Sequence, residues 1–324
     1  MNVITDRQSL KRCVKQIVRN CLATETQADC FLDGSPWGAE ALSQHQRDIL
    51  FDRRKLGRAL LQADEVAVIS AFDAMGFSDC SEDALRQGLT SYEREAWFRE
   101  ILDTARVSQV LVPIEMGSDS EWIRDSRIQP ELALNSALFA PGRYGINYES
   151  CAEQIRDASR ARGCRFLKLT DWCEEQLRYC VLPVCEEEKL ILDLQIEDFE
   201  KLRLFLSLYD EFGYFHAIIS VCGQMETLAM NLFSDKKRIL LRLSDLSHLP
   251  EALKKLGLHF IPYSSHAGTA EELLGRWIQA REKIWPELVE AYLPMAKAGC
   301  ELTDEMLEKD ISLLLGGNVR AWET

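Results

Sequence analysis

The sequence predicts an α/β protein, a distorted (β/α)8 TIM barrel with a helical insertion after its first strand. Eight apolar, β-branched segments recur along the chain, and most are followed by a segment with helical spacing of apolar residues. Several of these segments are near-continuous apolar runs, which is typical of parallel strands buried on both faces. Neither GxGxxG nor GxxxxGK[ST] occurs, so the nucleotide-binding kinds of α/β sheet lose support.

Length and charge narrow the class of protein. We predict one barrel domain over 1–324, with the insertion at 39–106, because 324 residues suit one large barrel. The formal charge of −14 disfavours nucleic-acid and anionic-membrane partners. No uninterrupted apolar run of 18 residues occurs, and the first 20 residues lack the apolar core of a signal peptide. We expect a cytoplasmic protein with a small-molecule substrate, able to form a homo-oligomer.

The 11 cysteines are scattered along the chain and form no C-x-x-C pair. An odd count without such a pattern predicts reduced thiols. Cys173, Cys180 and Cys185 are the one cluster, and their spacing matches no zinc site. We therefore expect most cysteines to serve as small buried hydrophobic residues.

Periodicity assigns the first half of the chain mostly to helices. A leading helix is predicted at 7–26, then a strand that runs into a turn at 28–38, then the helical insertion at 39–106 with breaks near Gly76 and Gly88. A clear strand at 107–116, a short helix at 130–139 and a weaker strand at 143–148 follow.

The second half alternates more regularly. Ser150 as N-cap, Glu153 in a capping box and Gly163 as C-cap bound one helix. Near the end, Pro286 is predicted to start a second helix, and Thr303 to cap the next one. Strands are expected at 164–172, 189–198, 215–224, 238–246 and 260–266; helices at 199–212, 225–233 and 249–256; and a closing turn at 318–322.

Four features resemble the amidohydrolase superfamily in its uronate isomerase-like branch. The leading helix and the segment DCFLDGSP at 29–36 resemble that branch's helix followed by Asp-x-His-x-His-Leu-x-Pro. The long insertion after the first strand resembles the one in the isomerases, and FLKL at 166–169 resembles the fourth strand. The segments YSSHAGTAEELLGRW and LTDEMLEKDISLLLGGNVRAW resemble the last strand, a long helix and a closing Asn-x-x-Arg region.

The resemblance also implies a degenerate metal site. Members of the family bind a divalent metal through two histidines of strand 1, often a histidine of strand 5 or 6, and an aspartate of strand 8. In this sequence the two strand-1 positions hold Phe31 and Asp33, and the strand-8 position holds His266. The strand-5 position holds Gln195, and the strand-6 position holds Ser220 or Cys222. We therefore expect no cofactor, with a zinc ion as the alternative.

Asp33 and His266 are the main catalytic candidates. They could belong to a rebuilt metal site, completed by Glu115 or Cys222. They could instead form a metal-free dyad, in which the carboxylate orients the imidazole as a general base. A third alternative is a polar pair without chemistry, and the sequence leaves all three open.

Lys168 and Arg242 are the next candidates. In a barrel, Lys168 could form a Schiff base or a carboxylated metal bridge, or it could be a solvated lysine. Arg242 lies inside an apolar strand, so it needs an anion there, either a structural carboxylate or a substrate carboxylate. Glu115, Gln195 and Ser264 lie at strand ends and could line the same pocket.

Two hypotheses of function follow. In the first, the chain is a hydrolase or sugar-acid isomerase of amidohydrolase type. Asp33 and His266 would transfer protons on a small carboxylated substrate, and Arg242 or Lys168 would hold its anionic group. In the second, the chain is a non-catalytic relative, kept for binding or assembly after it lost the metal ligands.

Overall fold

The structure is a computed structural model that describes residues 3–4, 6–32, 34–43, 46–47, 63–77, 81–118, 122–134 and 147–323. The chain divides into two compact units. Unit 1 comprises 1–112, 121–128 and 265–308, and unit 2 comprises 113–120, 129–264 and 309–324.

Among the described residues, eight strands form one sheet in the order of the sequence, and all the pairings between them are parallel. A parallel bridge between Ala28 and Ala267 pairs the segments that follow the first and last of these strands. Strand–helix alternation in this order is that of a (β/α)8 protein, so the predicted fold class is confirmed. The strands are β2 (Ala23–Glu25), β3 (Val107–Glu115), β4 (Ile128–Leu134), β5 (Phe166–Leu169), β6 (Ile191–Ile196), β7 (Ala217–Val221), β8 (Ile239–Arg242) and β9 (Phe260–Ile261). A separate antiparallel pair joins β1 (Val3–Ile4) to β10 (Leu302–Thr303).

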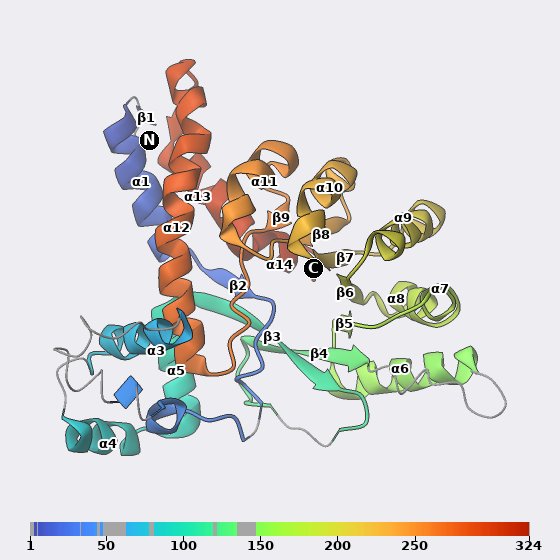
Figure 1. Ribbon diagram of the computed structural model, residues 1–324, viewed down its shortest axis with the longest axis horizontal. Helices are drawn as coiled ribbons and strands as arrows, with labels where there is room; N and C mark the ends of the chain where they lie inside the picture. The colour runs from blue at the N-terminus through green and yellow to red at the C-terminus, as the bar shows by residue number, and fades with distance from the viewer. Residues whose placement is uncertain are drawn as a thin grey trace. The chain divides into compact units, whose positions relative to one another are not determined.

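The described helices follow the predicted pattern in most places (Figure 1). They are α1 (Arg7–Asn20), α3 (Ala63–Ala74), α4 (Glu82–Thr90), α5 (Arg94–Ala105), α6 (Tyr148–Arg162), α7 (Glu174–Gln176), α8 (Leu182–Glu188), α9 (Phe199–Phe212), α10 (Gly223–Phe233), α11 (Leu249–Leu256), α12 (Ala270–Lys297), α13 (Asp304–Ser312) and α14 (Asn318–Arg320). The helices in the described part of 39–106 agree with a helical insertion, although Gly88 lies inside α4 and does not break it.

In unit 1 the long helix α12 packs against α1, α3 and α5, and Figure 1 shows α12 running beside α1. Gly275 allows the contact with α3, because a Cβ there would lie 1.7 Å from the carbonyl oxygen of Ala67. The buried side chain of Arg281 donates to the carbonyl oxygens of Ala105 and Arg106, at 3.1 and 3.0 Å, and to that of Val18. These bonds satisfy a guanidinium that would otherwise be costly to bury.

The prediction that Pro286 starts a new helix is wrong. α12 continues from Ala270 to Lys297 with Pro286 and Pro294 inside it. Its buried face extends past Pro286 through Ile284, Leu288 and Val289. Burial of this apolar face offsets the cost of about 3 kcal/mol that a proline imposes inside a helix.

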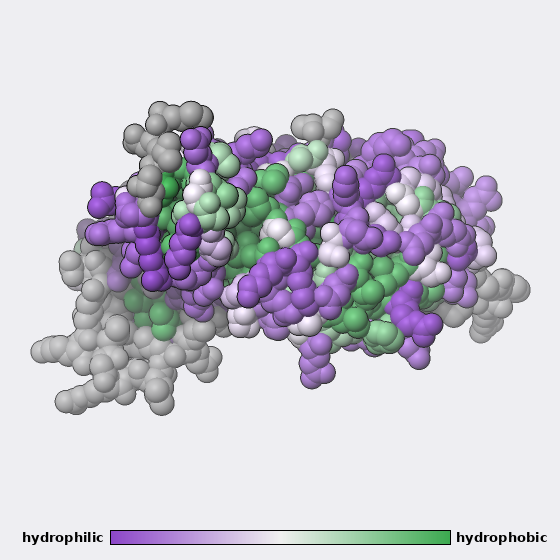
Figure 2. Space-filling view, turned by 90° about the horizontal axis from the view of Figure 1, so that it is seen from above, coloured by the Kyte–Doolittle hydropathy of each residue, from purple (hydrophilic) through white to green (hydrophobic). Residues whose placement is uncertain are grey.

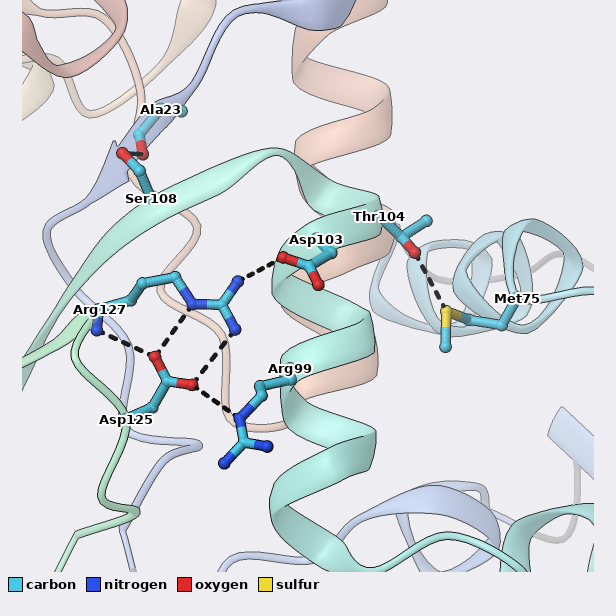
Figure 3. Close-up of polar contacts among 8 residues, drawn as sticks. All are labelled: Ala23, Met75, Arg99, Asp103, Thr104, Ser108, Asp125 and Arg127. Carbon is cyan, nitrogen blue, oxygen red and sulfur yellow. Dashed lines mark hydrogen bonds and ion pairs between the residues drawn. The ribbon is translucent and has the colours of Figure 1, made fainter.

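Four charged residues fix the turn before β4 onto α5 in unit 1 (Figure 3). Arg127 donates to Asp125 at 3.0 Å and to Asp103 at 2.6 Å, and Arg99 donates to Asp125 at 3.3 Å. Burial alone would raise the pKa of Asp125, but the hydrogen bonds and the charge of Arg127 outweigh it and lower that pKa. Asp125 is therefore charged over the neutral range and holds both arginines.

In unit 2 the helices α9, α10 and α11 flank β6, β7 and β8, as Figure 1 shows. Gly163 caps α6 in the left-handed conformation, with φ 65°, as predicted. The N-cap of α6 is Asn147 and not Ser150, because the side chain of Asn147 accepts the N–H of Ser150. In the closing turn, Asn318 Nδ2 donates to the carbonyl oxygen of Leu258 at 2.6 Å.

Two strand predictions are wrong. The first strand is Ala23–Glu25, where we expected the end of the leading helix, and α1 already ends at Asn20. The third strand is Ile128–Leu134, where we expected a helix at 130–139. The residues Glu, Leu and Ala there favour a helix in isolation, but pairing between parallel strands overrides that preference. Most of the strand predicted at 143–148 lies outside the described residues, and Tyr148 begins α6.

Hydrophilic residues cover most of the face drawn in Figure 2, and smaller hydrophobic areas lie between them. None of the helices in the described part of the chain is long and apolar enough to cross a membrane.

Candidate active site

Five polar residues of unit 2 share one face of the sheet. Lys168 is paired with Asp193, and Ser220 is paired with Arg242, so each pair points to the same side. Ala133 is paired with Lys168, and Gln195 with Ser220, so Glu131 and Asp193, two residues earlier on their strands, join that face. We call Glu131, Lys168, Asp193, Ser220 and Arg242 the polar cluster.

Three residues of the cluster lie towards the carboxyl ends of their strands. Arg242 is the last residue of β8, Lys168 is the last but one of β5, and Ser220 is the last but one of β7. Active sites of (β/α)8 enzymes are built at these strand ends. Lys168, Ser220 and Arg242 therefore have the placement that a catalytic site requires, whereas Glu131 and Asp193 lie in the middle of β4 and β6, below them.

Arg242 forms a buried bidentate ion pair with Asp193. Nη1 and Nη2 lie 3.1 and 2.5 Å from the two carboxylate oxygens, and Nη1 also donates to Ser220 Oγ at 2.9 Å. Both charged side chains are almost fully buried. Of the two anions that the sequence left open for Arg242, the structure shows the structural carboxylate, and its contact with a substrate carboxylate stays a prediction.

Glu131 is the unusual member of the cluster. Its side chain is fully buried, and its Oε2 lies 3.8 Å from Lys168 Nζ. Burial and the negative charge of Asp193 raise the pKa of Glu131 to about 8, while the positive charges of Lys168 and Arg242 oppose the rise. Among the described residues, neither carboxyl oxygen of Glu131 has a hydrogen-bond partner that would compensate a negative charge, which also favours the protonated form. At pH 7 Glu131 is therefore mostly neutral and holds a proton beside Asp193.

The chemistry of the cluster follows from these charges. With Glu131 neutral, one carboxylate faces two cations, so the cluster has an excess positive charge that favours an anionic ligand. Lys168 has a side-chain exposure of 18%, against 2% for Arg242, so it is the cation with access to solvent. A carboxyl group that titrates near neutral pH is suited to give or take a proton during a reaction.

The other predicted pocket residues of unit 2 lie at or beyond the ends of their strands. Gln195 is exposed, and its carbonyl oxygen accepts a hydrogen bond from Trp172 Nε1 at 3.0 Å. Glu115 is exposed at the end of β3, and its carbonyl oxygen accepts a hydrogen bond from Arg162 at 3.0 Å. Ser264 is buried after β9. A role for any of the three in binding substrate stays a prediction.

In unit 1 the structure describes part of the predicted dyad. Asp33 lies outside the described residues. His266 is exposed and has a φ of 51°, a left-handed conformation that is strained for a residue with a Cβ. Its carbonyl oxygen accepts a hydrogen bond from Arg276 at 3.3 Å. The pairing of Asp33 with His266 stays a prediction.

Phe31 occupies the position of the first metal-binding histidine in the resemblance. It is fully buried in unit 1, and its ring lies 5.3 Å from that of Phe98. Within the described ranges, no three His, Cys, Asp or Glu side chains come together as a metal site. Phe31 therefore cannot be the first ligand of the set that the resemblance implies, and the expected absence of a metal stays a prediction.

Sequence reasoning missed Glu131 and Asp193. Asp193 is a single carboxylate in the apolar segment LILDLQI, which is the same signal that singled out Arg242 in ILLRLSD. Two opposite charges, each inside an apolar strand, could have been paired with each other. Glu131 was missed because its strand was predicted to be a helix.

Comparison with known proteins supports the fold and nothing finer. No family model matches the chain, and no curated protein matches it. A uronate isomerase structure from Bacillus halodurans C-125 superposes with a TM-score of 0.76 at 17% sequence identity, covering 98% of this chain and 97% of that one. A uronate isomerase structure from Thermotoga maritima gives a TM-score of 0.58 at 10% identity, covering 99% and 100%. The resemblance inferred from the sequence is thus confirmed at the level of the fold, because this chain folds like structures of uronate isomerases.

Proposed function

We propose that this chain acts on a small carboxylated substrate, such as a sugar acid, by acid–base proton transfer without the usual metal. The polar cluster carries the proposal, because it combines excess positive charge with a carboxyl group whose pKa is about 8. The likeness of the fold to structures named uronate isomerases supports this class of substrate.

The proposed proton transfer would isomerise the sugar acid, and this isomerisation needs few groups. A base removes the proton from the carbon next to the carbonyl carbon while the carbonyl oxygen takes a proton, which gives an enediol. The neighbouring hydroxyl then loses its proton and the former carbonyl carbon takes one, so no proton is gained or lost overall. In our proposal the Lys168 ammonium donates the proton to the carbonyl oxygen and, as the neutral amine, takes the proton of the neighbouring hydroxyl, so it ends the reaction charged again. The neutral carboxyl group of Glu131, 3.8 Å from Lys168 Nζ, leaves the cluster with an excess positive charge that attracts the substrate's carboxylate. Asp33 and His266 stay the sequence-based candidates for the base at carbon.

The test is proton exchange at carbon, which detects the first step even when net turnover is slow. We would incubate the protein with D-glucuronate or D-galacturonate in D2O and follow loss of the C2 proton signal by NMR. Lys168→Met should slow the exchange by about 100-fold, in the range of general acid–base catalysis. Lys237→Met, at an exposed lysine of the same unit, is the matched control and should exchange like the wild type.

The absence of exchange with every sugar acid tried would refute the proposal, and exchange that appears only after Zn²⁺ or Mn²⁺ is added would refute its metal-free mechanism. Equal rates for the two lysine variants would remove Lys168 from it. The second candidate is a non-catalytic binding role, which the burial of Phe31 in an aromatic core favours. This binding role predicts saturable binding of a sugar acid without any exchange of its C2 proton.

A further inference from the structure

A cavity in unit 1 is lined by none of the residues proposed for catalysis. It has a volume of about 430 Å³, within the range of about 300–1,000 Å³ that is usual for small-ligand sites. Its walls come from the segment after the first strand and from α4 with the turn that follows it. None of its lining residues belongs to the polar cluster.

The lining combines aromatic faces with polar groups of both charges. Trp37 and Tyr92 provide the aromatic rings, and Glu40, Arg86 and Thr90 provide a carboxylate, a guanidinium and a hydroxyl. A hydroxylated six-membered ring matches this combination. Its C–H faces can pack against aromatic rings, while its hydroxyl groups can donate to a carboxylate and accept from a guanidinium.

One buried glutamate connects two sides of the cavity through hydrogen bonds. The Oε1 atom of Glu271, in the first turn of α12, accepts the backbone N–H of Gly38 and the Nε1–H of Trp97, the latter at 2.7 Å. Trp97 in turn packs edge-on against Tyr92, with ring centroids 5.3 Å apart. The cavity wall at Gly38 and the one at Tyr92 are therefore tied to the same carboxyl group, which makes the site preorganised.

The floor of the cavity also needs a glycine. Gly38 has a φ of 58°, and a Cβ there would lie 3.4 Å from Leu89 Cδ1, another lining atom. A side chain at this position would be strained by the left-handed backbone and would contact Leu89. The sequence therefore keeps the backbone of the floor close to the space that a ligand would fill.

We infer that this cavity binds the pyranose ring of a carbohydrate. The inference goes beyond the proposed function, because it concerns equilibrium binding at another place in the chain and needs no turnover. It also gives a role to Trp37, which lines the cavity.

The experiment is a binding titration of the full chain by calorimetry and saturation-transfer NMR. The probes are the methyl β-D-pyranosides of glucose, galactose and mannose, with D-glucuronate as an acidic probe. We expect at least one probe to bind saturably. Trp37→Ala should weaken its Kd by about tenfold, equivalent to about 1.4 kcal/mol, and Arg86→Ala by about fivefold.

Matched variants separate the cavity from general effects. Trp285→Ala and Arg99→Ala change the same residue types elsewhere in unit 1 and should leave the Kd within about twofold of the wild type. Lys168→Met should bind the three neutral pyranosides normally, so failure of the proposed function would leave this result intact. Circular dichroism checks that every variant is folded.

Two results would overturn the inference. One is the lack of saturable binding for all four probes at concentrations up to about 10 mM, where even a weak site would fill. The other is a loss of affinity in Trp285→Ala equal to that in Trp37→Ala, which would place the bound ring outside this cavity.

Discussion

The buried carboxyl group of Glu131 should make the stability of the protein fall as the pH rises. In the unfolded chain Glu131 has its ordinary pKa of 4.5, and in the folded chain that pKa is about 8. At a pH between these two pKa values, Glu131 has released its proton in the unfolded state and still holds it in the folded state. The contribution of Glu131 to stability is therefore greatest below pH 4.5 and is lost as the pH approaches 8.

The size of the effect follows from the pKa difference. Each pH unit between the two values costs about 1.36 kcal/mol of unfolding free energy, so the whole interval costs about 5 kcal/mol. Between pH 5.5 and pH 8.0 the loss from this one group is about 3 kcal/mol. Glu131→Gln keeps the shape of the neutral side chain and removes the titration, so the variant should lack this loss.

The assay is urea unfolding of the wild type and of Glu131→Gln at pH 5.5 and pH 8.0. The variant should be more stable than the wild type by about 1.4 kcal/mol at pH 5.5 and by about 4 kcal/mol at pH 8.0, a divergence of about 3 kcal/mol. Glu153→Gln changes an exposed glutamate of α6 and serves as the control, with no such divergence. If the difference between wild type and Glu131→Gln were the same at both pH values, the assignment of a neutral Glu131 would be refuted.

Three further predictions concern other contacts. Arg242→Leu leaves Asp193 buried without its cation, so urea unfolding should show a loss of about 3–5 kcal/mol, much of it recovered when Asp193→Leu is added; equal losses in the single and double variants would contradict this. Gly275→Ala brings a Cβ against the backbone of α3 and should lower stability by about 1–3 kcal/mol in the same assay, so an unchanged midpoint would show that the helices are not in close contact. Asp33→Asn and His266→Ala should each slow C2 proton exchange of the substrate by about 100-fold if they form the base, and unchanged exchange rates would remove them from the reaction.

The order of strands and helices could be predicted from the sequence because apolar periodicity follows local structure. The prediction failed at Ile128–Leu134, where the residues on their own favour a helix and pairing with the neighbouring strand holds them extended. It failed again at Pro286, because the buried face that carries α12 past this residue depends on partners far away in the sequence.

The candidate site could be predicted only in part, for a related reason. Lys168 and Arg242 were identified as single charges inside apolar strands, and both belong to the polar cluster. The carboxylate that pairs with each cation is set by the register between the strands, and the sequence does not give that register directly. The neutral state of Glu131 depends on its burial beside Asp193, so it follows only from the folded structure.

The make-up of unit 1 has a consequence for how the chain is synthesised. Its core joins residues from both ends of the sequence, as when Trp277 Nε1 donates to Glu25 at 2.9 Å and Arg281 donates to the carbonyl oxygen of Val18. The first 112 residues therefore leave the ribosome long before α12 exists to cover them, and their apolar surface stays open until about residue 300 is made. Fragments that end before α12 should aggregate when expressed alone, and a cell that produces this protein needs to shield the growing chain over most of its length.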